Sequence, residues 1–478
     1  MTEKKLNPTR RDILLGTGAT VTALSLADLL KPFEALAETP KKGGKFVYAG
    51  IPSSKHKTLK KAKHPYYGLE IRTTITYDRL TWVDENLNVV PQLATSWEAI
   101  EDDQTVWEAE IREGVKFHDG RDLTVEDVVA SYNMHKHKKL GTSFSKKLLK
   151  DIEKVGPQKV RFHLLSPNSE LPWWMAEYRQ AIMPADELSK MGYSGNGTGP
   201  FKFVKIDPGR RVIYEPNENY WGDGPYLDQL EVISQKGVDP VNAYLAGQID
   251  AILQADPGLI GQFKERDDTV VDFATSGDQI LMILPKVDGS VFSDRRIRQA
   301  LSLALDREQI VRIAYNGLGW VSNDSHMHAA SPDFLAKSPI RDVTKAKKLL
   351  KEAGYPEGIT LPTFYYAPYY PEIGRVFQVA AESVKDAGIT MPIEERPLDG
   401  YRKWRVEDKK KTRKHRFAMG PVGARNSSAN MFRMARPTYN ESGYWHPSTE
   451  GNTYIAMYKK AMMTGDTLKR REIYHEMQ

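Results

Sequence analysis

The chain has 478 residues, of which 40% are hydrophobic and 27% are charged. This composition is typical of a folded soluble protein, and the length allows two or three domains around a large core. The net charge of +6 is small for this length and accompanies no nucleic-acid-binding motif, which argues against a nucleic-acid partner. Because the sequence has no cysteine, it excludes disulfides, cysteine-ligated zinc, thiol catalysis and a lipid-anchored N-terminal cysteine.

The N-terminal segment has the three parts of an export signal. Arg10 and Arg11 form a pair that resembles the twin-arginine motif. A stretch rich in apolar and small residues follows over residues 13–30, and Ala35 and Ala37 provide a small-x-small cleavage pattern. We expect cleavage near Ala37 and a mature protein that is free in the periplasm.

Alternating apolar and polar residues, bounded by glycines and turn residues, predict short strands in the first half of the chain. The predicted strands are residues 45–49, 106–111, 115–118, 160–165, 201–206, 212–215, 229–234 and 250–253. Thr124 and Asp127 have the spacing of a capping box, which predicts a helix that runs through Tyr132. Another helix, over residues 241–246, is expected to end at Gly247.

The second half of the chain has a more helical pattern. Amphipathic segments and their caps predict helices over residues 296–305, 306–315, 344–353 and 375–387. Gly354 and Gly388 are expected to end the last two. Residues 364–366 predict a strand. Because helices and strands alternate along the chain, the fold class is α/β.

Four sequence blocks, taken in order, resemble the extracellular solute-binding proteins of family 5, which serve ABC importers of peptides, nickel and related ligands. The blocks are residues 77–80 with 91–98 and 117–128, residues 197–201 with 219–221 and 245–250, residues 294–307, and residues 346–355. One block alone would be weak evidence, but all four in order are specific. They consist of turns, helix caps and amphipathic stripes, and none contains a nucleophile or a general base.

The resemblance implies two hinge-linked α/β lobes of the class II-like periplasmic binding protein fold, with an extra subdomain inserted in the first lobe. The expected segments are a signal peptide (1–37), the first lobe (38–83 and 197–290), the inserted subdomain (84–196) and the second lobe (291–478). The lobes would close around a small ligand and deliver it to membrane permease subunits. We further expect a monomer without cofactor, nucleic-acid partner or enzymatic activity. The N-terminal segment, rather than the resemblance, indicates export by the twin-arginine machinery.

Two alternatives stay open. Close histidine pairs lie within residues 135–137 and 326–328, and such pairs can bind nickel, copper or haem iron. Lysines flank the first pair, whereas Asp324 lies near the second; packing or surface roles are nevertheless more frequent for such histidines. No Gly-x-Ser-x-Gly elbow of a serine hydrolase appears. The other alternative is a sensor or binding module that delivers nothing to a transporter.

The ligand is the least determined feature. In dipeptide-binding relatives, the loop after the strand that matches residues 417–420 carries Trp and Asp. Here Pro421 stands at the Trp position, and Ala424 falls at the Asp position with Arg425 beside it. An ammonium group would therefore meet a cation instead of its counter-ion, and we expect a ligand with an anionic group, such as an opine or sugar conjugate or an organic acid. A peptide ligand remains open.

The predicted ligand-binding residues combine aromatic walls with polar groups of that loop. They are Tyr365, Tyr366, Tyr369, Ala424, Arg425, Asn426 and Trp445. The C-terminal sequence gives a further expectation. Relatives continue past the segment that matches residues 466–478 and return a strand to the first lobe, whereas this chain ends within a helical pattern. We therefore expect that about 50 residues are missing at the C-terminus.

Overall fold

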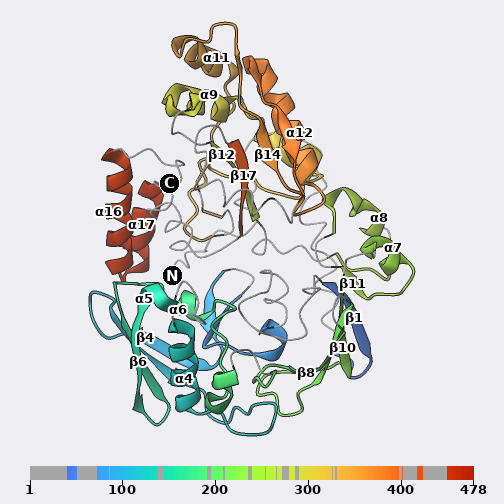
Figure 1. Cartoon of the computed structure of the whole chain (residues 1–478), viewed down its shortest axis with the longest axis vertical. Coiled ribbons are helices and arrows are strands. Elements are labelled where there is room, and N and C mark those ends of the chain that lie inside the picture. The colour runs from blue at the N-terminus through green and yellow to red at the C-terminus, as the bar shows by residue number, and fades with distance from the viewer. Residues whose placement is uncertain are drawn as a thin grey trace, which may run out of the picture. The chain divides into compact units, whose positions relative to one another are not determined.

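Three main sheets organise the computed structural model of the protein (Figure 1). The residues that it describes are 40–50, 73–84, 87–137, 145–190, 195–207, 210–234, 239–252, 255–264, 266–271, 279–285, 290–325, 327–328, 331–397, 401, 417–423 and 449–478. All helices and strands named below lie in one compact unit, Gly43–Gln478.

The first sheet joins strands from two distant parts of the chain. Its strands are β1 (Lys45–Gly50), β8 (Phe201–Asp207), β9 (Arg211–Pro216), β10 (Gln229–Ser234) and β11 (Ala251–Ile252), in the order β11-β1-β10-β9-β8. β1 is parallel to β10 and β11, and β8, β9 and β10 are antiparallel. Helix α7 (Pro240–Leu245) precedes β11 and ends before Gly247, which has a φ of +67°. This confirms the predicted helix stop.

The second sheet is antiparallel and lies within the segment predicted as the inserted subdomain. Its strands are β4 (Ala94–Ala99), β5 (Val106–Ile111), β6 (Leu149–Gly156) and β7 (Lys159–Leu164), in the order β4-β5-β7-β6. The short elements around it are β2 (Thr81–Val83), β3 (Val89–Pro91), α5 (Ser145–Leu148), α6 (Leu171–Met175) and η2 (Ala185–Lys190). Helix α4 (Val125–Lys136) packs on the sheet, with Tyr132 edge-on to Phe162. It begins with the predicted Thr124–Asp127 capping box, which is confirmed.

The strand predicted over residues 115–118 is wrong. The structure has only an isolated bridge between Lys116 and Asp122 there, around a turn in which Gly120 has a φ of +88°. The physical reason is that β5, the preceding strand, already pairs with β4 on one side and β7 on the other. A strand inside a sheet has no free edge for a hairpin partner. Residues 115–118 therefore form part of a loop instead of a strand.

The third sheet carries the second half of the chain. Its strands are β12 (Gln279–Pro285), β14 (Phe364–Tyr366), β16 (Ile393–Glu395) and β17 (Phe417–Gly423), in the order β12-β17-β14-β16. β14 is parallel to both β16 and β17, whereas β12 is antiparallel to β17. β12 lies inside the range predicted for the first lobe, yet its partner strand belongs to this sheet.

Helices cover this sheet and build its core. They are α9 (Arg295–Ala304), α10 (Arg307–Ala314), α11 (Val343–Glu352) and α12 (Ile373–Ser383), with the short elements η4 (Val291–Ser293), η5 (Val384–Ala387), β13 (Ile359–Thr360) and β15 (Ile389–Thr390). The short elements η3 (Pro257–Leu259) and α8 (Gly261–Lys264) follow β11, and Phe263 of α8 packs edge-on against Tyr244 of α7. Phe377 of α12 packs on Phe364 with ring centroids 4.6 Å apart. Gly354 and Gly388 have φ values of +93° and +78°, which confirms both predicted helix stops.

Helices α16 (Thr449–Met463) and α17 (Thr467–Met477) form a C-terminal pair. They pack around the fully buried Met327, together with Met462, Tyr474 and their neighbours. Among the described residues, no helix is both long and apolar enough to cross a bilayer.

Candidate functional site

The carboxyl ends of β14 and β16 lie side by side at one edge of the third sheet, because the two strands are parallel. Ligands of open α/β sheets bind outside the carboxyl ends of parallel strands. Tyr365 and Tyr366 end β14, and Arg396 directly follows β16. This edge is therefore the candidate ligand-binding surface among the described residues.

Tyr365 and Tyr366 point to opposite faces of the sheet, since side chains alternate along a strand. Tyr366 is buried against α12, with its ring 5.5 Å from that of Phe377. Burial, and then the nearby Glu395 carboxylate, raise the pKa of Tyr366. Its position in the core accounts for this tyrosine without a ligand, so its predicted binding role remains a prediction.

Tyr365 lies on the other face, in register with Glu394. The guanidinium of Arg396 stacks over the Tyr365 ring, 4.6 Å from its centroid. The backbone N–H of Arg396 donates to the carbonyl of Tyr366 at 2.8 Å, which fixes the start of the arginine side chain. Nη2 of Arg396 is 3.3 Å from Oε1 of Glu394. An aromatic ring and a cation thus share this face of the sheet.

Two further tyrosines extend this edge. Tyr401 is fully buried, and its hydroxyl donates to the carbonyl of Tyr365 at 3.1 Å. The ring of Tyr369 meets that of Tyr401 edge-on at 6.2 Å and is partly buried against the core of the third sheet. Tyr365 and Tyr369 were predicted from the sequence, whereas Tyr401 and Arg396 were not. Arg396 could have been predicted from the sequence. The short run of apolar and acidic residues after Gly388 indicates a strand, and Arg396 directly follows it, at the carboxyl end.

The remaining predicted site residues lie outside the described residues. They are Ala424, Arg425, Asn426 and Trp445 for the ligand, and Arg10, Arg11, Ala35 and Ala37 for the export signal. β17 reaches Gly423, where it pairs with Gln279, so the strand ends three residues later than predicted. Its last residue in register with β14 is Ala418. β17 therefore extends five residues beyond the partner of Tyr365.

Three described residues in or near the two histidine segments make contacts within the protein. His135 is buried, and its Nε2 lies 2.9 Å from the carbonyl of Ala181. Asp324, the acid near the second pair, forms an ion pair with Arg307 at 2.7 Å, and Met327 is buried against the C-terminal helices. Within the described ranges, which omit His326, no group of three metal-ligating side chains comes together.

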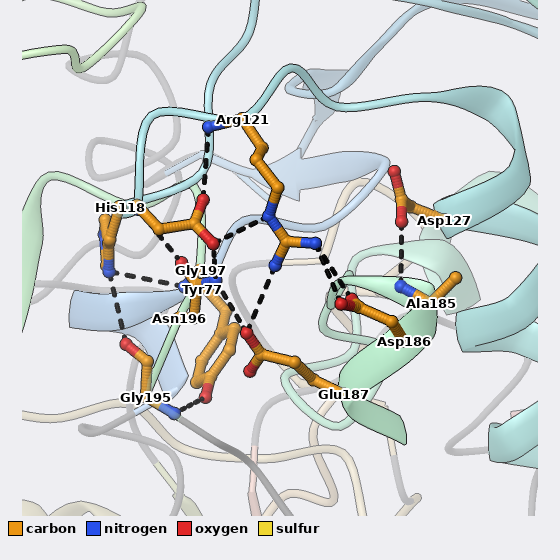
Figure 2. A network of polar contacts seen from close by, with 11 residues as sticks. Tyr77, His118, Arg121, Asp127, Ala185, Asp186, Glu187, Gly195, Asn196 and Gly197 are labelled. Carbon is orange, nitrogen blue, oxygen red and sulfur yellow. Dashed lines mark hydrogen bonds and ion pairs between the residues drawn. The ribbon is translucent and has the colours of Figure 1, made fainter. Parts of the chain in front are cut away.

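The polar residues of the first two sequence blocks form one network (Figure 2). His118 lies between two backbone carbonyls, with Nδ1 3.2 Å from Gly195 O and Nε2 3.0 Å from Gly199 O. Arg121 donates to both Asp119 and Asp186, at 2.7 Å and 3.0 Å. These contacts join the turn before α4 to the segment before β8, which indicates a scaffold role for these blocks.

A second polar centre lies beside this network. The carboxylate of Asp78 is fully buried and accepts hydrogen bonds from Gln92, Thr198 and Trp221 at 2.7, 2.9 and 2.8 Å. Burial raises the pKa of Asp78, and the bonds from Trp221 and Thr198 oppose that change. Residues from three separated parts of the chain thus meet at one carboxylate, and none of the described contacts resembles a nucleophile with its base.

The comparison with known families decides the assignment. The model of the family described as "Bacterial extracellular solute-binding proteins, family 5 Middle" matches residues 88–443. The chain belongs to this family. Its two-lobe α/β fold is that of family 5 periplasmic binding proteins, which bind substrates for transporters rather than transform them.

Individual relatives agree with that assignment. The chain is 25% identical to the dipeptide-binding protein of Escherichia coli K12 over 434 residues, which cover 82% of this chain and 78% of the relative. The structure of the periplasmic binding protein DppA from Helicobacter pylori, in complex with the peptide STSA, has a TM-score of 0.71 and 22% identity, covering 92% of this chain and 90% of that one. The structure of AgaA from A. tumefaciens R10, in complex with agropinic acid, has a TM-score of 0.66 and 21% identity, covering 91% and 88%.

Proposed function

We propose that this family 5 solute-binding protein captures a small organic ligand in the periplasm and delivers it to the permease of an ABC importer. The observation that carries the proposal is the family match over residues 88–443. Relatives with this fold were solved with a peptide and with agropinic acid, so the fold accommodates organic ligands that differ in size and chemistry.

Two lobes that close on a hinge are the means of capture in this proposal. We place the inserted subdomain in residues 84–196, and the first lobe in residues 38–83 and in the chain from residue 197 to before Gln279. The pairing of β1 with β10 and β11 supports a discontinuous first lobe. The pairing of β12 with β17 favours a second lobe that begins before Gln279 rather than at residue 291.

The ligand of this proposal carries at least one anionic group. The sequence supports this, because Arg425 lies beside Ala424 at the position where dipeptide-binding relatives carry an acid. Arg425→Ala should weaken binding by about 2–5 kcal/mol, since a buried anion would lose its partner. Calorimetric titration measures this with the ligand that thermal-shift screening selects from peptides, sugars, organic acids and metal ions.

The variant should keep the melting temperature of the wild type without ligand, which separates binding from folding. Equal affinities of the two proteins would remove Arg425 from the site. A ligand that is a cationic amine or a metal ion would reopen the peptide and nickel alternatives.

Export by the twin-arginine pathway is the second part of the proposal. The pair Arg10 and Arg11, followed by an apolar stretch and the Ala35/Ala37 pattern, supports it. Changing both arginines to lysine should leave the uncleaved protein in the cytoplasm, because the pathway reads guanidinium groups rather than charge alone. Fractionation and immunoblotting measure this, and a normal periplasmic yield of the double variant would contradict the proposed route.

A further inference from the structure

Helices α9 and α11, which pack together beside the third sheet, carry an excess of positive charge (Figure 1). With their N-caps Asp294 and Asp342, the two helices contain seven cations and three anions, a net charge of +4. The C-terminal pair α16 and α17, with its N-cap Asp466, contains five cations and four anions. The whole chain has a net charge of only +6. The α9–α11 pair is therefore far more basic than the chain as a whole.

Two of the seven cations have structural contacts. Arg296 donates to the Asp294 carboxylate and to the Glu352 carbonyl, which joins the start of α9 to the end of α11. Arg298 donates to the Phe292 carbonyl. The other five side chains are exposed and form the basic face: Arg295, Lys345, Lys347, Lys348 and Lys351. Among the described residues, only Lys348 of these five has an acidic group within ion-pair distance, the Glu352 carboxylate at 4.0 Å.

The arrangement of the basic face does not stabilise the helices that carry it. Residues three or four positions apart are neighbours on a helix surface, and like charges at this spacing repel each other. In α11 this spacing pairs lysine with lysine three times: Lys345 with Lys348, Lys348 with Lys351, and Lys347 with Lys351. Neither α9 nor α11 has an acidic residue in its first turn, where the helix dipole would favour one. Since the fold gains nothing from these charges, they point to a binding role.

The composition of the basic face favours a lipid surface over a protein partner. The exposed side chains of α11 are its four lysines, Thr344 and Glu352, and none of them is apolar or aromatic. Protein interfaces are depleted in lysine and depend on buried aromatic and apolar anchors. A lysine ammonium is a point charge on a flexible stem, without the planar fork of arginine. Such groups suit mobile anionic headgroups, which attract each lysine that comes near the bilayer surface.

We propose that the basic face binds the anionic phospholipid headgroups of the membrane that holds the permease. This inference rests on the proposed function, because that function places the permease in the membrane. The chain has no cysteine for a lipid anchor, so the basic face supplies a reversible attraction to the bilayer instead. Protein held near the bilayer meets the permease more often than protein free in solution.

Co-sedimentation of the full-length chain with lipid vesicles tests the proposal. One set of vesicles contains phosphatidylcholine alone, and the other contains phosphatidylcholine with an equal part of phosphatidylglycerol. The wild type should bind the anionic vesicles at least about tenfold more strongly, because each lysine near an anionic surface adds attraction. High salt should remove this difference, because it screens the charges. Residues 1–37 are present in every variant, so their contribution to binding is the same in each.

Two variants with an equal loss of charge locate the binding. The first changes the lysines of α11 to glutamine, which has a similar helix propensity: Lys345→Gln, Lys347→Gln, Lys348→Gln and Lys351→Gln. The control changes four exposed lysines elsewhere: Lys150→Gln, Lys459→Gln, Lys460→Gln and Lys469→Gln. The first variant should lose at least about tenfold in affinity for anionic vesicles, and the control should stay within about twofold of the wild type. Where the first variant does not fold, the double variant Lys347→Gln/Lys351→Gln replaces it and should lose at least about threefold.

Native membranes separate a lipid partner from a protein partner. Right-side-out vesicles of a bacterial cytoplasmic membrane should bind the wild type equally before and after protease treatment. Loss of binding after the treatment would overturn the lipid assignment and indicate an acidic protein surface. Equal binding to neutral and anionic vesicles, or equal losses in the two variants, would also overturn it. These measurements use no solute, so the lipid assignment can fail while thermal-shift screening still finds a ligand and the proposed function stands.

Discussion

At the scale of single residues, His118 links two parts of the chain through its ring. The carbonyls near its two nitrogens belong to Gly195 and Gly199, which lie 77 and 81 positions further along the chain. Burial lowers the pKa of His118 below the ordinary 6.5, although both carbonyls oppose that change. Lys202 also lowers this pKa, and Asp119 raises it.

The lowered pKa predicts acid sensitivity. Below about pH 6.5 the unfolded chain takes up a proton at His118 that the folded protein does not, so the free energy of unfolding falls as the pH falls. His118→Gln should lose about 1–2 kcal/mol of stability at about pH 7.5. At that pH the neutral imidazole has one N–H, which can donate to Gly199 O from Nε2, while Nδ1 accepts the N–H of Gly197 at 3.3 Å. The difference from wild type should shrink at about pH 5.5.

Urea unfolding at both pH values measures this difference. His137→Gln, at an exposed histidine that ends α4, is the control and should follow the wild type at both. A difference between His118→Gln and wild type that does not change with pH would contradict the assignment of acid sensitivity to His118.

At the scale of elements, two glycines after α11 differ in how closely the backbone of another segment approaches them, although both have a left-handed backbone. Gly354 and Gly358 have nearly equal φ values of +93° and +99°. A Cβ added at Gly354 would meet no atom within 4 Å, whereas one at Gly358 would lie 2.3 Å from the carbonyl oxygen of Gly388. That carbonyl accepts the N–H of Ile359 where β13 and β15 meet.

Gly354→Ala should cost about 1–2 kcal/mol of stability, because only the left-handed backbone is strained. Gly358→Ala should cost at least about 2 kcal/mol more, because its Cβ displaces a backbone hydrogen bond in a packed core. Denaturant unfolding of both variants measures the difference. Equal losses of stability in the two variants would show that β13 and β15 can shift apart near Gly358 without a loss of stability.

At the scale of the molecule, the C-terminal helices connect segments that are distant in sequence. The Tyr474 hydroxyl donates to the Glu170 carboxylate at 2.7 Å, and the Ser169 N–H donates to the carbonyl of Met462 at 2.9 Å. On another side, Arg471 forms an ion pair with Asp333 at 3.1 Å. One helix pair thus holds both the chain near α6 and the connection between α10 and α11.

Tyr474→Phe should therefore lower the free energy of unfolding by about 1–2 kcal/mol, since it removes a buried hydrogen bond to a carboxylate. Tyr226→Phe is the control: its hydroxyl also bonds a carboxylate, that of Asp223, but at the exposed surface, and no measurable loss is expected. Chemical unfolding monitored by tryptophan fluorescence measures both. A similar loss for the two variants would show that burial of the Tyr474 bond is unimportant.

The sequence by itself determined the local features and the family. The Thr124–Asp127 capping box and the helix stops at Gly247, Gly354 and Gly388 are confirmed, because caps and left-handed glycines are set by a few neighbouring residues. The ordered blocks of turns and caps were likewise sufficient to recognise family 5, since a family shares those local requirements.

Only the tertiary structure decided which strands pair and which side chains meet. Residues 115–118 alternate like a strand but have no free edge to pair with, and β12 joins β17 although 131 residues separate their ends (417 − 286). Tyr365 and Tyr366 look equivalent in sequence, yet the pleat buries one and sets the other under Arg396. The pairing of strands and the face of the sheet on which each side chain lies depend on contacts between distant residues. Periodicity along the chain does not encode these contacts.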